Sequence, residues 1–144
     1  MRRRWARVAL ALAVLAGPSA CGSKATGISV TIDPDPVPAS RLSDGSYMAD
    51  WDAVVADLTG VGGTVQSIEA GVSGATSVNT PTSQGASAPS VGVAVEPFAR
   101  KLFRQSSQFT VASGQAVSVQ VTVTFRGGDG QSYQASAQAR VVLR

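Results

Sequence analysis

Residues 116–143 read AVSVQVTVTFRGGDGQSYQASAQARVVL, and apolar and polar side chains alternate on both sides of a glycine-rich centre. The alternating apolar residues are Val117, Val119, Val121, Val123 and Phe125 before the centre and Tyr133, Ala135, Ala137, Ala139, Val141 and Leu143 after it. A period of two over this length puts one face of a strand in a core and the other in water. If residues 128–130 are a three-residue loop with Gly130 left-handed, Phe125 lies opposite Tyr133. This stretch therefore predicts one long β-hairpin in an all-β fold.

The positive charge of the chain is concentrated at its beginning. The 144 residues carry a net charge of +3, but four of the arginines, Arg2, Arg3, Arg4 and Arg7, lie together just before an apolar run at residues 8–16, and small residues follow at 18–20. A charged region, a short apolar run and small residues are the three parts of a secretory signal peptide. Without residues 1–20, 8 basic residues (12 minus 4) stand against 9 acidic ones, a net charge near −1. We therefore expect an exported protein with no nucleic-acid partner.

The single cysteine, Cys21, directly follows these small residues. A signal peptide that ends in small residues immediately before a cysteine resembles those of bacterial lipoproteins. The resemblance implies a signal peptide at 1–20, a diacylglyceryl group on Cys21 as the new N-terminus, and a lipidated tether at 21–27. The acyl chains, at about 0.8 kcal/mol per buried CH₂, would hold the protein on a membrane. Ordinary secretory cleavage beside an incidental cysteine is the alternative.

The segment at residues 28–58 contains one clear strand and one ambiguous element. Ile28, Val30 and Ile32 alternate with polar residues, and the prolines at 34, 36 and 38 end that strand because proline lacks an N–H. Residues 46–58 fit an amphipathic helix by local propensity, but they also fit a strand with Trp51 on its apolar face. We interpret them as a strand, because a glycine-rich connection at 60–63 leads into an apparent hairpin partner at 64–68.

The rest of the chain is patterned for short strands. Residues 71–90 are rich in Ser, Thr and Gly, so we expect a flexible loop there, with one short strand near 75–78. Residues 91–95 predict a strand, residues 98–104 a single helical turn or irregular crossover, and residues 108–112 another short strand. These elements predict one antiparallel β-sandwich domain at 28–144 with about seven strands.

This domain resembles the immunoglobulin-like and fibronectin type III-like modules of bacterial surface proteins. The likeness rests on a strand that ends in a proline corner at 30–38, Trp51 in a later strand, and the hairpin joining Phe125 to Tyr133. It implies an immunoglobulin-like β-sandwich.

Catalytic residue types are scarce. The chain has no histidine, so neither a Ser–His nor a Cys–His pair exists, and the glycine-rich residues 60–63 lack the lysine of a phosphate loop. Asp50, Asp52 and Asp57 are expected to point mostly to solvent. We expect no enzyme and no cofactor.

Two clusters and one aromatic residue remain as candidates for binding. Asp33, Asp35 and Asp44 could hold Ca²⁺ if they gathered at one end, but aspartate beside proline is also ordinary turn chemistry, so no metal ligand is assigned. A basic–aromatic cluster (Arg100, Lys101 and Arg104 with Phe98 and Phe103) could contact anionic lipid headgroups or a glycan, although a solvated face over core phenylalanines is the simpler interpretation. Trp51 is expected in the core.

The sequence therefore predicts an exported, lipid-anchored protein of the bacterial cell envelope that acts as a non-catalytic binding or structural module. Its expected partners are the membrane, through lipid on Cys21, and an envelope protein or a glycan. A Ca²⁺-dependent adhesion or carbohydrate-binding module is the alternative.

Overall fold

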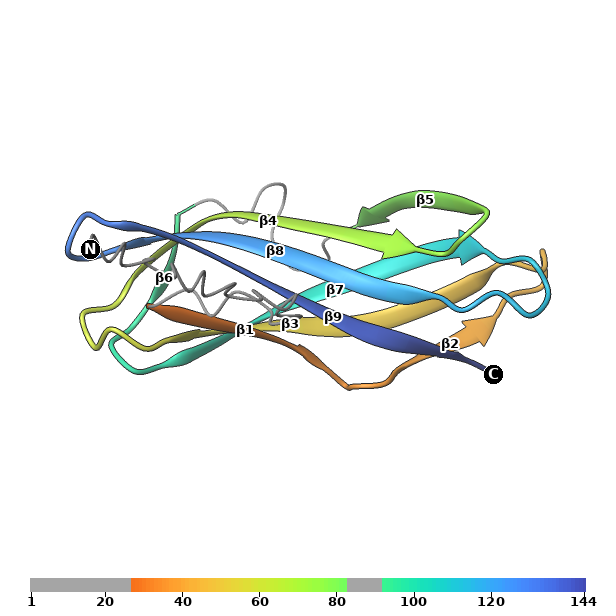
Figure 1. The fold of residues 1–144 in the computed structure, drawn as a ribbon, viewed down its shortest axis with the longest axis horizontal. Coiled ribbons are helices and arrows are strands. Elements are labelled where there is room, and N and C mark those ends of the chain that lie inside the picture. The colour runs from red at the N-terminus through yellow and green to blue at the C-terminus, as the bar shows by residue number, and fades with distance from the viewer. Residues whose placement is uncertain (1–26, 83–91) are drawn as a thin grey trace, which may run out of the picture.

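The computed structural model describes residues 27–82 and 92–144, which form nine β-strands and no α-helix (Figure 1). The strands are β1 (Ile28–Asp33), β2 (Val37–Arg41), β3 (Tyr47–Asp57), β4 (Gly63–Ser73), β5 (Ser77–Thr82), β6 (Val93–Val95), β7 (Arg100–Thr110), β8 (Ser118–Gly127) and β9 (Ser132–Leu143). The all-β prediction is confirmed. The predicted signal peptide, Cys21 and part of the predicted flexible loop lie outside the described residues.

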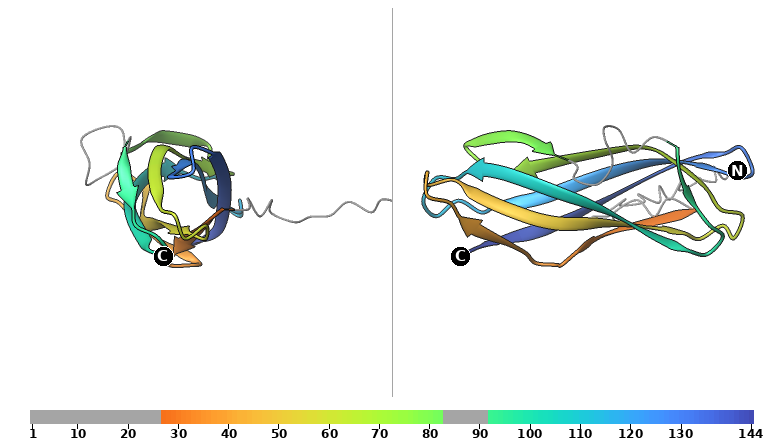
Figure 2. Two further views of the ribbon diagram at one scale, coloured as in Figure 1. Left: turned by 90° about the vertical axis from the view of Figure 1, so that its left-hand side faces the viewer. Right: turned by 180° about the vertical axis from the view of Figure 1, so that it is seen from behind.

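The strands form one curled sheet. Its order is β5-β7-β3-β2-β9-β8-β4-β6, and β1 also pairs with β3. All pairs are antiparallel except the one between β2 and β9. Seen end-on, the strands run around a common interior (Figure 2). In the described part of the chain β5 and β6, the two ends of this order, do not pair with each other, so the molecule is a curled half-barrel. The described residues form nine strands where about seven were expected.

The predicted hairpin is confirmed with its register. Phe125 lies opposite Tyr133, and Val123, Val121 and Val119 lie opposite Ala135, Ala137 and Ala139. Gly130 has a φ of 81°, and its N–H donates to the Gly127 carbonyl oxygen at 2.9 Å. This is the left-handed position that the three-residue loop requires.

Strand β3 resolves the ambiguity between helix and strand. Trp51 is 2 % exposed, and Ala49, Ala53 and Val55 on the same face are fully buried. β3 pairs with β7 along one edge and with both β1 and β2 along the other. These pairings satisfy the backbone of β3 on both sides, and they outweigh its local preference for a helix.

The predictions for residues 71–112 were partly wrong. β4 continues to Ser73, β5 spans Ser77–Thr82, and one strand, β7, replaces the helical turn and the short strand expected between residues 98 and 112. Ten residue pairs join β7 to β3, from Tyr47↔Phe109 to Ala56↔Arg100. The pairing with β3 therefore overrides the irregular local pattern of this segment. In the resulting strand Phe103 points inward and Leu102 points outward.

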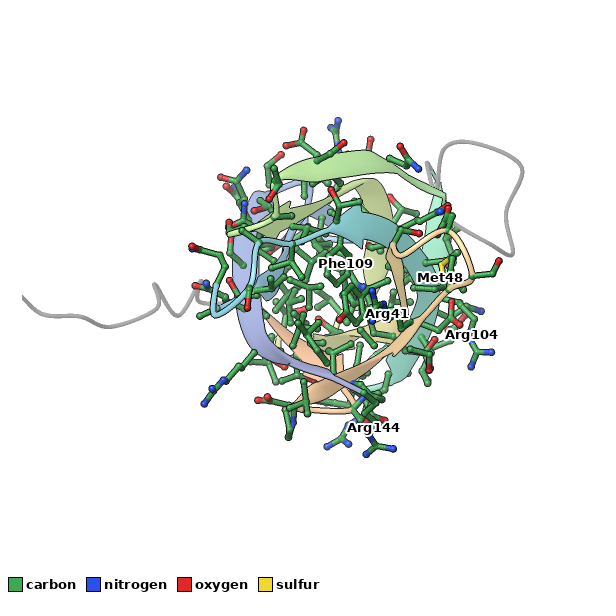
Figure 3. The ribbon with its side chains drawn as sticks, turned by 90° about the vertical axis from the view of Figure 1, so that its right-hand side faces the viewer. Arg41, Met48, Arg104, Phe109 and Arg144 are labelled. Carbon is green, nitrogen blue, oxygen red and sulfur yellow. The ribbon has the colours of Figure 1, made fainter. Side chains whose placement is uncertain are left out.

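The two ends of the molecule differ. We call them the near end, at the left of Figure 1, and the far end, at its right. The near end carries Gly27, which precedes β1, and the β3–β4, β6–β7 and β8–β9 turns. The far end carries the β2–β3 turn and Arg144, whose N–H donates to the Ala39 carbonyl oxygen at 2.9 Å. Viewed from the far end, Phe109 lies inside the ring of strands, whereas Arg104 and Arg144 project outside it (Figure 3).

Val121→Asp should abolish cooperative unfolding, because it buries a carboxylate at a position that is 1 % exposed. Thr124→Asp is the matched control: Thr124 faces outward on the same strand, opposite Ser67 and Gln134, and should cost no more than about 1 kcal/mol. Urea unfolding followed by circular dichroism measures both. Equal stability of the two variants would contradict the inward register of β8.

Candidate functional site

The turns of the near end are joined by one buried carboxylate. Asp57, the last residue of β3, is 2 % exposed. Its oxygens accept hydrogen bonds from the Thr59 N–H (3.0 Å) and hydroxyl (2.6 Å), and from the N–H groups of Gly60 (3.0 Å), Gly62 (3.2 Å) and Phe98 (3.1 Å). Asp57 thus ties the β3–β4 turn to the β6–β7 turn.

Asp57 was expected to point to solvent, and that prediction is wrong. Asp57 shares the strand parity of Trp51 and Val55, which places its side chain on the buried face. The sequence does hold a signal for this: residues 59, 60 and 62 are Thr, Gly and Gly, a turn composition that supplies N–H donors to a preceding aspartate. Asp50 is exposed as expected, and Asp52 is partly exposed.

The hydrogen bonds keep Asp57 ionised. Burial raises the pKa of this carboxyl, but the hydroxyl of Thr59 and the N–H groups of Phe98, Thr59 and Gly62 favour the charged form more strongly and lower the pKa to about 2. The near end therefore contains a fixed negative charge whose hydrogen-bonding capacity is already used by the turns.

Three large apolar side chains project from these turns. Leu58 is 57 % exposed, Val61 is 51 % exposed and Phe98 is 75 % exposed; we call them the apolar tip. Phe98 has a φ of 56°, which is unusual for a residue with a side chain. Its ring lies directly on Gly60, where a Cβ would overlap it. The bond from the Phe98 N–H to Asp57 holds this backbone in place.

The predicted basic–aromatic cluster is divided. Phe103 is buried in the core, and Arg104 pairs with Asp52 across the outer face (Nε–Oδ1 3.2 Å), where Figure 3 shows it projecting outward. Arg100 and Lys101 are exposed at the start of β7, two and three residues after Phe98. The expectation of a core-facing Phe98 is wrong, because Phe98 lies in the turn between β6 and β7 and not in either strand.

The three candidate Ca²⁺ ligands are not brought together. Asp33 ends β1 and Asp35 lies in the following corner, whereas Asp44 lies in the β2–β3 turn and accepts from the Ser46 N–H (2.9 Å) and hydroxyl (2.6 Å). These bonds lower the pKa of Asp44. Among residues 27–82 and 92–144, no three His, Cys, Asp or Glu side chains are grouped so that they could hold a metal ion.

A shallow hollow of about 530 Å³ lies on the outer face of β4, β8 and β9. Glu69, Gln120, Thr122, Ser136 and Gln138 line it. Several of these groups already bond to neighbours, as in the 2.9 Å contact between the Thr122 and Ser136 hydroxyls. The lining offers hydrogen-bonding groups and one carboxylate, that of Glu69.

No protein-family model matches the chain, and no curated protein matches it significantly. Within the described segments, no helix has the length and hydropathy needed to cross a bilayer.

The stability that Asp57 contributes should be lost in acid. Its pKa in the folded state, about 2, lies below the ordinary value of 3.8, so the unfolded chain takes up the proton first as the pH falls. This stability, about 2 kcal/mol, should be fully present above pH ~4 and disappear as the pH falls towards 2. Urea unfolding across this range measures it.

Asp57→Asn should remove this part of the acid dependence and lower the stability at neutral pH by about 2 kcal/mol, because an amide cannot accept all five bonds. The exposed Asp50→Asn removes the same charge from the same strand and should change little. An acid dependence that is identical in wild type and Asp57→Asn would contradict the role given to Asp57.

Phe98→Gly should leave the free energy of unfolding within about 1 kcal/mol of wild type. Relief of the left-handed backbone offsets the loss of a ring that is mostly exposed. Phe103→Ala is the matched control and should cost about 3 kcal/mol, because Phe103 is 8 % exposed and fills the core. If the two variants lose equal stability in thermal unfolding, Phe98 is a core residue and the apolar tip is only structural.

Proposed function

We propose that the protein is an exported, lipid-anchored module of the bacterial cell envelope, which binds or supports another component and catalyses no reaction. The observation that carries the proposal is the position of Cys21, directly after small residues at 18–20 that we predict to end a signal peptide, and six positions before Gly27. Gly27 lies at the near end, and the described chain ends at the far end. A lipid on Cys21 would therefore hold the near end towards the membrane.

An immunoglobulin-like architecture is the second part of the proposal. β5, β7, β3 and β1 are successive neighbours in one part of the curled sheet, and β9, β8 and β4 are successive neighbours in the other part. This order resembles the two sheets of immunoglobulin-like domains. β2 continues the first strand beyond the proline corner and passes from β3 to a parallel pairing with β9, and β6 is a short addition at the edge of β4. These two strands account for nine rather than seven.

The proposal that the protein catalyses no reaction is supported by the hydrogen bonds and the ion pair that three of its carboxylates make within the fold. Asp57 is held by turn N–H groups, Asp52 pairs with Arg104, and Asp129 accepts from the Tyr133 hydroxyl at 2.7 Å. Each has a structural partner within reach. A glycosidase would instead need two carboxylates facing each other across a cleft.

Anchoring at one end would present the other end to a partner. The 12 residues of β9 run the length of the molecule, roughly 40 Å at about 3.3 Å per residue. An envelope protein or a glycan would then meet the far end or the sides of the sheet. The edge of β4 beyond Val65, which β6 does not cover in the described part of the chain, is suited to an added strand.

Membrane fractionation tests the anchor. Wild type should sediment with membranes and carry a diacylglyceryl mass on Cys21 by mass spectrometry, whereas Cys21→Ser should be released. The double change Cys21→Ser and Ser23→Cys keeps one cysteine but moves it from the small-residue site, so it should not restore the anchor. If wild type and Cys21→Ser partition alike, the lipid-anchor proposal fails.

A further inference from the structure

The apolar tip lies at the end from which the predicted anchor emerges. The Leu58 N–H donates to the Gly27 carbonyl oxygen at 2.9 Å, so the first described residue touches the turn that carries Leu58 and Val61. Cys21 is six residues before Gly27. Even fully extended, this tether spans no more than roughly 20 Å. Any lipid on Cys21 is therefore confined to the neighbourhood of the apolar tip.

The apolar tip is held in an exposed position. It comes from two turns far apart in sequence, and the carboxylate of Asp57 binds N–H groups of both. Gly60 leaves room for the Phe98 ring to lie across the β3–β4 turn. These contacts keep Phe98, Leu58 and Val61 together at the surface and prevent them from folding back over the core.

The opposite end has a different composition. Arg41, Asp44 and the terminal Arg144 lie there, and Arg41 and Arg144 are exposed. Of the six large apolar side chains that are exposed in the described residues, three form the apolar tip, and Leu102 lies on β7 four residues after Phe98. The other two, Val78 on β5 and Val142 on β9, are the least exposed of the six, at 39 % each. Exposed apolar groups gathered at one end indicate a contact surface, whereas isolated ones do not.

We infer that the apolar tip inserts into the interfacial region of the bilayer that holds the acyl chains of Cys21. The inference rests on the proposed lipid anchor, and it adds an orientation: the near end sits on the membrane and the far end points away. Leu58, Val61 and Phe98 enter the boundary between headgroups and acyl chains, and Arg100 and Lys101 lie at the level of the headgroups.

A bilayer fits this surface better than a second copy of the chain. The tether brings lipid to the apolar tip without any further partner. A two-fold contact between two tips would instead bring the cations at positions 100 and 101 of both copies together, which opposes association.

The experiment uses the acylated full chain in vesicles of phosphatidylethanolamine and phosphatidylglycerol. Acylation blocks Cys21, so Phe98→Cys and Val142→Cys each provide one free thiol for an environment-sensitive fluorophore. Val142 is exposed on β9 near the far end and serves as the matched control. Nitroxide lipids with the quencher near the headgroup should quench the label at 98 several-fold more than the label at 142, and emission at 98 should shift to the blue.

Failure of the orientation is distinguishable from failure of the anchor. If the protein stays on the vesicles but the two labels are quenched equally, the apolar tip faces away from the lipid and the inference is overturned while the anchor stands. If emission at 98 shifts to the blue without quenching and depends on protein concentration, the tip binds a second copy, and the inference is likewise overturned.

If wild type itself takes the label at Cys21 and leaves the vesicles, the anchor proposal fails. The variant Cys21→Ser with Phe98→Cys then decides the inference: quenching by the same vesicles supports it, and no quenching overturns it. Circular dichroism checks that each variant folds. Val61→Cys, on the other turn of the tip, replaces Phe98→Cys if that variant is unfolded, with the same outcomes.

Discussion

The inward register of β3 is the constraint on which the rest of the structure depends. β3 pairs with β1, β2 and β7, and its inner face carries Trp51 and Val55 into the core. Because side chains alternate strictly along a strand, the same register turns Asp57 inward at its end. A buried carboxylate is costly unless hydrogen bonds compensate for lost water. The two turns that supply those bonds therefore take their shape from the burial of Trp51.

The shape of these turns in turn decides what the near end exposes. The Phe98 N–H donates to Asp57 from a backbone with positive φ, and in this conformation the ring lies over Gly60 and is mostly exposed to solvent. Leu58 and Val61 lie on the turn whose Gly60 and Gly62 N–H groups face the carboxylate. A polar group in the interior thus creates an apolar surface outside. This arrangement links the stability of the fold to the proposed contact with a bilayer.

The sequence alone determined the features that depend on neighbours along the chain. The β8–β9 hairpin was predicted with its register, because the alternation of valines and alanines and the glycine at the left-handed turn position act locally. The all-β class followed from the same alternation. The burial of Trp51 was also expected, since both its size and its place in an alternating pattern favour the core.

Only the tertiary structure decided the features that depend on partners far away in sequence. Residues 98–104 look irregular in isolation, yet from Arg100 on they form a strand, because β3 offers ten backbone partners to β7. The parallel pairing of β2 with β9 joins segments about one hundred residues apart and leaves no local pattern. Asp57 and Phe98 were expected in each other's places, the acid outside and the ring inside. The inward position of Asp57 follows from its strand parity with Trp51. The outward position of Phe98 depends on its hydrogen bond to Asp57, which spans 41 residues and exists only once the turns have met.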